Sequence, residues 1–427
     1  MLLLIAIVLF ALMLIGVPIA ISLSLASICA IVLSAVPVPL TVVAQRFFTS
    51  VDSFALLAIP FFMLAGELMM TGSMAKRITN FAFACVGWSV GGLAQVSTLA
   101  SMFFAGISGS GAADTAAIGK MMIPAMEKKG YDKAFAASTI ATAGTIAVVI
   151  PPSIPMIVYG VTAGVSIGAL FTAGIMPGIL IGFSLMFLNY FISKKKGYDK
   201  EKSTFQFPEF RKTLKEGIWA LLLPLIIIVG IRAGVFTPTE SAAIAAAYAL
   251  VVGMFVYKDL KLKHLPEIFQ RAAVTTSMVI FIIAAANLFG WILTADQIPQ
   301  KLADLIIRVT ENPYMILLLI NILLLIAGCF LNASAAITIL TPLLLPLTNA
   351  VGIDPVFLGL VIVVNLSIGL ITPPVGLDLF IVQGIANVEF GRLVRAIFPF
   401  ILLLAVDLLI ITYFPDLSMW LPYMLGD

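Results

Sequence analysis

Four short segments interrupt otherwise apolar sequence: two contain small residues with oxygen-bearing side chains, and two contain a Pro-Pro pair. A Pro-Pro pair lacks two backbone N–H donors and clashes with the preceding turn, so a helix must unwind there and release carbonyl groups. Away from water, released carbonyls need a partner, and together with hydroxyl and amide oxygens they suit a hard cation such as Na⁺. The candidate cation ligands are Ser108, Gly109, Ser110, Gly111, Pro151, Pro152 and Ser153, and in the second half Asn332, Ala333, Ser334, Thr372, Pro373, Pro374 and Gly376.

Acidic residues within the apolar segments add candidate contacts to an ion or a substrate, because ionisable groups at membrane depth are usually functional. Asp114 follows the first small-residue segment, where it suits either a helix cap or a direct contact to ion or substrate. Asp378 follows the second Pro-Pro pair and is open to the same two interpretations. Thr115, Thr145 and Asn365 are further candidates for contacting the substrate or supporting the site.

The composition places these residues in a membrane. Of 427 residues, 62% are hydrophobic and 11% are charged, far from the values of a soluble domain. Apolar runs of about 20 residues recur along the chain, long enough to cross the hydrocarbon core as helices. The single histidine lies in a charged stretch, so no catalytic or metal-binding set is available at membrane depth. We therefore expect neither enzymatic activity, nor an organic cofactor, nor a nucleic-acid partner.

The basic residues predict the orientation of the chain. If residues 91–126 and 313–350 are re-entrant hairpins, 19 of the 24 lysines and arginines fall on one side, which the positive-inside rule makes cytoplasmic. The apolar segment 2–34 is then the first span, with the N-terminus inside and the C-terminus outside. An additional crossing before the first hairpin would reverse the side of the N-terminus.

The chain matches itself at an offset of 222 residues, which aligns residues 124–180 with residues 346–402 without a gap. An odd number of crossings separates equivalent points, so the copies have inverted orientation, as is typical of secondary transporters. We predict an all-α polytopic fold of two inverted-topology repeats, each with a re-entrant hairpin and a Pro-Pro-broken helix. The predicted parts are a first repeat 1–193 (hairpin 91–126, broken helix 134–165), a cytoplasmic basic loop 194–217, a connecting span 218–232 and a second repeat 233–427 (hairpin 313–350, broken helix 355–387).

Five motifs, in order, resemble those of the large membrane subunit of TRAP (tripartite ATP-independent periplasmic) transporters, and the resemblance covers essentially the whole chain. The motifs are AIPFFMLAGELM (58–69), SGSGAADTAAIGKMMIPAM (108–126), ATAGTIAVVIPPSIPMIVYG (141–160), GVFTPTESAAIAAAYAL (234–250) and LITPPVGLDLF (370–380).

The resemblance implies Na⁺-coupled uptake of an organic acid across the bacterial inner membrane. It implies two partners, a small four-helix membrane subunit and a periplasmic substrate-binding protein. The fold is similar to that of elevator-type divalent anion/Na⁺ symporters, in which a transport domain slides against a scaffold. By motif, one Na⁺ site is expected at residues 108–111 with 151–153, and a second at residues 332–334 with 372–376.

The resemblance leaves the substrate open among C4-dicarboxylates, sialic acid and other carboxylated sugars, and 2-oxoacids. No arginine or lysine lies at the predicted midplane to bind a second carboxylate, which favours a monocarboxylate such as sialic acid. The alternative is a stand-alone ion- or proton-coupled carboxylate transporter or exchanger of the same fold.

Overall fold

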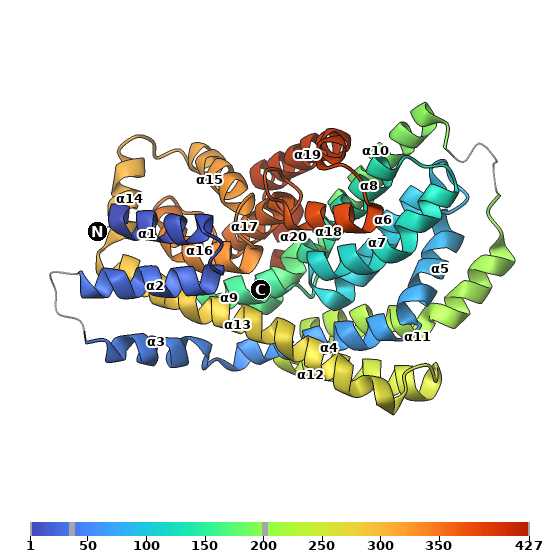
Figure 1. Ribbon diagram of the computed structural model, residues 1–427, viewed down its shortest axis with the longest axis horizontal. Coiled ribbons are helices and arrows are strands. Elements are labelled where there is room, and N and C mark those ends of the chain that lie inside the picture. The colour runs from blue at the N-terminus through green and yellow to red at the C-terminus, as the bar shows by residue number, and fades with distance from the viewer. Residues whose placement is uncertain (1, 34–38, 199–203, 426–427) are drawn as a thin grey trace.

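The structure is a computed structural model that describes residues 2–33, 39–198 and 204–425. Within these ranges the chain forms helices and no strand (Figure 1). Eight helical stretches of this part are long and apolar enough to cross a membrane, which confirms the expected all-α polytopic fold. The first half comprises α1 (Leu2–Leu14), α2 (Ile19–Val32), α3 (Thr41–Val51), α4 (Ala58–Thr71), α5 (Met74–Val86), α6 (Gly92–Ser108), α7 (Gly111–Lys128), α8 (Lys133–Val149), α9 (Ile154–Ala163) and α10 (Ile167–Lys196).

Several helices at the predicted hairpins and breaks are too short to cross the hydrocarbon core alone. Helices α6, α15 and α17 have 17, 16 and 15 residues, or about 25 Å and less at 1.5 Å per residue, against a core of about 30 Å. The second half comprises α11 (Phe207–Arg232), α12 (Pro238–Val251), α13 (Leu265–Ala295), α14 (Ile298–Ile307), α15 (Pro313–Gly328), α16 (Ala333–Ala350), α17 (Pro355–Gly369), α18 (Leu377–Ala386), α19 (Phe390–Tyr413) and α20 (Asp416–Leu425).

The first apolar segment differs from the prediction of one span. The described part of this segment, residues 2–33, contains two helices, α1 and α2, which pack against each other. They are separated at Gly16, whose φ is +85°, and at Pro18, which has no N–H to continue a helix. The side of the N-terminus therefore no longer follows from the distribution of basic residues.

Helix α11 also begins earlier than the predicted connecting span, at Phe207 rather than at residue 218. Its first turns carry charged residues such as Glu209 and Lys212, which form an exposed pair three residues apart. Apolar sequence marks the part of a helix inside the membrane, and it does not mark where the helix starts.

Helices α8 and α17 form the centre of the molecule. Every residue of α8 from 134 to 149 is buried, as is every residue of α17 from 357 to 369. Helices α6 and α7 pack against α8, and α15 and α16 pack against α17. The halves also interlock, because α7 packs on α18 and α16 packs on α9. Each hairpin therefore contacts the broken helix of both halves of the chain.

Local features recur in the two halves within one residue of the 222-residue offset. Asn189 Nδ2 donates to Thr98 Oγ1 at 3.0 Å, and Asn321 Nδ2 donates to Thr412 Oγ1 at 3.0 Å. These pairs are related by 223 residues, with the amide and hydroxyl exchanged between the helices. Each amide–hydroxyl hydrogen bond joins the first helix of a hairpin, α6 or α15, to the long helix that follows the broken helix, α10 or α19.

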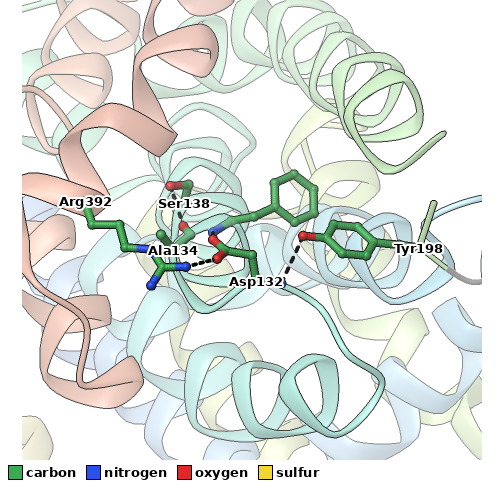
Figure 2. A network of polar contacts seen from close by, with 6 residues as sticks. Asp132, Ala134, Ser138, Tyr198 and Arg392 are labelled. Carbon is green, nitrogen blue, oxygen red and sulfur yellow. Dashed lines mark hydrogen bonds and ion pairs between the residues drawn. The ribbon is translucent and has the colours of Figure 1, made fainter. Parts of the chain in front are cut away.

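A polar network fastens the start of α8 to two other helices (Figure 2). Asp132 Oδ1 accepts from the Phe135 N–H at 3.0 Å and so caps α8. Its other oxygen pairs with Arg392 on α19, and its own N–H donates to the Tyr198 hydroxyl after α10 at 3.0 Å. Partial burial of Asp132 raises its pKa, but the Phe135 N–H and the charges of Arg392 and Lys196 outweigh this, and the net pKa is lowered.

Candidate functional site

The tip of the first hairpin lies directly against the first Pro-Pro break. Gly109 has a left-handed φ of +60° between α6 and α7. A Cβ atom at this position would lie 2.7 Å from the Pro152 carbonyl oxygen. The Ile154 N–H donates to the Gly109 carbonyl at 3.3 Å. Glycine is therefore required here both for its backbone conformation and for close contact with the break.

The break itself is held by one buried serine. The Ser153 hydroxyl donates to the Val148 carbonyl at 2.5 Å and accepts from the Met156 N–H at 3.3 Å. It thereby joins the last turn of α8 to the first turn of α9 across the cis Pro151–Pro152 bond. The structure thus brings together the residues predicted for the first site, at positions 108–111 and 151–153.

The second hairpin meets the second break at different residues. A Cβ atom on Gly369 would lie 2.6 Å from the Gly328 carbonyl carbon, so the ends of α15 and α17 are in close contact. Asn332 caps α16 by accepting from the Ala335 N–H at 2.9 Å, and Gly376 has a left-handed φ of +59° before α18. A cation site formed by Asn332, Ala333 and Ser334 with Thr372, Pro373, Pro374 and Gly376 stays a prediction.

Two carboxylates from opposite halves of the chain approach each other beside α8. Asp114 on α7 and Asp378 on α18 are both completely buried and close enough to repel each other. A Cβ atom on Gly144 would lie 1.9 Å from Thr115 Oγ1 and 3.2 Å from Asp378 Oδ2, so this glycine makes room for both. Among the described residues, Asp114 Oδ2 has no hydrogen-bond donor, and the Thr115 hydroxyl interacts with the Asp378 carboxylate. Buried anions of this kind need a cation or a proton.

Asp114 does not cap its helix. The cap of α7 is Ser110, whose hydroxyl accepts from the Ala113 N–H at 3.5 Å. Asp114 Oδ1 instead accepts from the Ser108 hydroxyl at 2.5 Å, which points the carboxylate back toward the tip. Helix α18 has no side-chain cap, so the capping interpretation is wrong for Asp378 as well. Contact with an ion or a substrate is the interpretation that stays open for both.

The remaining candidates have structural bonds. The Thr145 hydroxyl donates to the Thr142 carbonyl within α8 at 2.7 Å. Asn365 Nδ2 donates to the carbonyl and the side-chain oxygen of Asn321, both at 3.0 Å, and so joins α17 to α15. Both side chains are buried, and a role for either in substrate binding stays a prediction.

A cavity of about 540 Å³ extends from the first hairpin tip along α7. Ser108 and Ser110 line it at the tip, and three cations, Lys76, Lys120 and Arg271, line it elsewhere. Sequence reasoning missed this grouping, because the three cations come from α5, α7 and α13, which only the folded chain brings together. The preference for a monocarboxylate stays a prediction.

Paired hairpins and broken helices around buried oxygen atoms, in a multi-span helical bundle, define a membrane permease. The family profile described as "Tripartite ATP-independent periplasmic transporter, DctM component" matches residues 6–417. The chain belongs to this family, whose members are transport proteins of the bacterial inner membrane.

Three relatives show how the names within the family differ. The chain is 47% identical over 412 residues to an isethionate TRAP transporter permease protein DctMQ of Oleidesulfovibrio alaskensis, covering 96% of this chain and 65% of the relative. It is 44% identical to a C4-dicarboxylate TRAP transporter large permease protein of Pseudomonas aeruginosa (90% of each chain). It is 40% identical to a sialic acid TRAP transporter large permease protein of Vibrio cholerae (89% of this chain, 88% of the relative).

A solved structure supports the fold alone. The Alcanivorax borkumensis YdaH transporter superposes with a TM-score of 0.62 at 15% sequence identity, covering 96% of this chain and 98% of that one. Helix arrangement is therefore shared over nearly the whole length.

Proposed function

We propose that this chain is the large permease subunit of a Na⁺-coupled, binding-protein-dependent transporter that imports an organic acid across the inner membrane. The observation that carries the proposal is the pair of buried carboxylates, Asp114 and Asp378, which lack sufficient hydrogen-bond donors and lie near a hairpin tip and a broken helix. Serine hydroxyls and freed carbonyls beside them supply the oxygen ligands that a hard cation requires. Na⁺ neutralises this site and makes binding of an anionic substrate favourable.

The packing of helices from both halves of the chain supports an elevator motion. Helices α7, α8 and α18 pack as one group, and the cavity separates α7 from α4 of the surrounding helices. In the proposed cycle, this group moves as a transport domain with ion and substrate, while α4, α11, α12 and α13 form the scaffold. A small four-helix membrane subunit extends the scaffold, and a periplasmic protein delivers the substrate.

Reconstitution tests this function. The chain and its small subunit are placed in proteoliposomes with external binding protein, and uptake of labelled succinate, sialic acid and isethionate is compared with and without an inward Na⁺ gradient. We expect uptake of one of these acids only when both the gradient and the binding protein are present. Uptake that persists when the Na⁺ gradient or the binding protein is omitted would overturn the proposal.

A proton-coupled, stand-alone transporter is the second candidate, because two adjacent buried carboxylates can share a proton instead of binding Na⁺. In that case a pH gradient drives uptake in choline buffer, and the binding protein has no effect. Replacement of Na⁺ by choline separates the two candidates in one preparation.

A further inference from the structure

The cavity beside the first hairpin tip carries an excess of positive charge. Its lining includes Lys76, Lys120 and Arg271, against the single acid Glu67. Arg271 also pairs with Glu267 on its own helix. In the described part of the chain, neither lysine has an acidic partner within 4 Å. Two exposed lysines without an acidic partner therefore line a space large enough for a small-molecule ligand.

The shape of α7 directs Lys120 toward the hairpin tip. Helical side chains lean toward the N-terminus of their helix, which for α7 is the tip itself. The residues of α7 that line the cavity between the tip and Lys120 are small: Ala113, Ala116 and Ala117. At the 222-residue offset, Ile339 takes the place of Ala117 and Pro342 that of Lys120. A cavity of about 400 Å³ also lies beside the second hairpin, where Thr338 and Pro342 line it and Arg46 of α3 is its cation. Lysine on the returning helix of the hairpin is therefore specific to the first cavity, although a cavity lies beside each hairpin.

We propose that Lys120, supported by Lys76 and Arg271, forms a second anion site in this cavity, separate from the tip. The site takes the carboxylate or sulfonate group of a small organic acid as it leaves the tip. This inference rests on the proposed function for the identity of the ligand. The site itself depends only on the cavity, so it is tested without Na⁺ coupling or partner subunits.

The electrostatic test uses a reporter cysteine at position 117. Ala117→Cys is made in the full chain after replacement of the native cysteines, which are Cys29, Cys85 and Cys329. Modification rates are measured with one anionic and one cationic methanethiosulfonate reagent of similar size. Lys120→Gln is compared with Lys128→Gln, a lysine in the last turn of the same helix that does not line the cavity.

Lys120 lies three residues from the reporter, or about 6 Å away, where a unit charge in water changes a rate about threefold. We expect Lys120→Gln to slow the anionic reagent by roughly this factor and to accelerate the cationic one similarly. Succinate or isethionate should protect the cysteine from modification, and tetramethylammonium should not. Equal rates in Lys120→Gln and Lys128→Gln, or protection by none of the anions, would overturn the site.

Transport kinetics separate this site from the proposed function. In the reconstituted complex, we expect Lys120→Gln to raise the KM for the acid several-fold and to leave the Na⁺ dependence of uptake unchanged, with Lys120→Arg restoring the KM. Loss of Na⁺ dependence in the unmodified complex would refute the proposed function and not the anion site. An unchanged KM in Lys120→Gln would refute the role of the site in transport.

Discussion

Substitution of Gly109 by alanine tests the contact between the first hairpin tip and the first break. The new Cβ lies 2.7 Å from the Pro152 carbonyl oxygen, whereas ordinary contact begins near 3.4 Å. The tip must therefore move away by several tenths of an ångström. The left-handed φ of +60° adds about 1–2 kcal/mol of backbone strain for alanine. We expect the Na⁺ concentration for half-maximal uptake to rise about tenfold, which corresponds to about 1.4 kcal/mol.

Gly130→Ala is the matched control. Gly130 also has a left-handed φ, +82°, but a Cβ there meets nothing within 4 Å. The control therefore has the same backbone strain without the displacement at the break. Both variants should lower the melting temperature in detergent, Gly109→Ala by the larger amount, and only Gly109→Ala should change the Na⁺ dependence of uptake. Identical Na⁺ dependence in the two variants would refute the proposed site at the tip.

Two further predictions concern stability. Asp132→Asn retains a helix cap but loses the ion pair to Arg392, which costs about 0.2–1 kcal/mol at neutral pH. Because the pKa of Asp132 is lowered in the folded protein, this contribution is present above the ordinary value of about 3.9 and disappears as the pH falls below it. Melting curves of the two proteins should converge there, and a gap unchanged down to pH 3 would contradict the ion pair. Gly359→Ala places a Cβ 2.2 Å from the Tyr159 ring and should destabilise the protein by about 1–3 kcal/mol. Gly384→Ala is the control, because a Cβ there meets nothing within 4 Å, and it should leave the stability unchanged. Equal melting temperatures of the two variants would refute the close packing of Gly359 on Tyr159.

Prolines and glycines made much of the local structure predictable. Helices α8 and α17 end at Val149 and Gly369, shortly before Pro151 and Pro373. Proline has no N–H to continue the hydrogen bonds of a helix, and this effect is confined to a few residues of sequence. Gly16 and Pro18 carried the same kind of signal for the turn between α1 and α2. The long apolar run around that turn favours one span and masks the signal.

The tertiary arrangement of charges was not predictable from local sequence. Asp114 and Asp378 lie on different halves of the chain, and only the packing of α7 on α18 brings them together. Capping by Asp114 was a reasonable expectation from spacing. Ser110 takes that role because it directly precedes α7 and its hydroxyl reaches the Ala113 N–H. The carboxylate is thereby left to interact with the Ser108 hydroxyl.

Binding of ²²Na⁺ to the purified chain tests the central claim most directly. Wild type, Asp114→Asn and Asp378→Asn are compared at equal Na⁺ concentrations, with melting temperature as the control for folding. We predict that each substitution weakens Na⁺ binding at least tenfold while the protein remains folded, since an uncharged amide does not compensate the cation. Folded variants that bind ²²Na⁺ as wild type does would contradict the account.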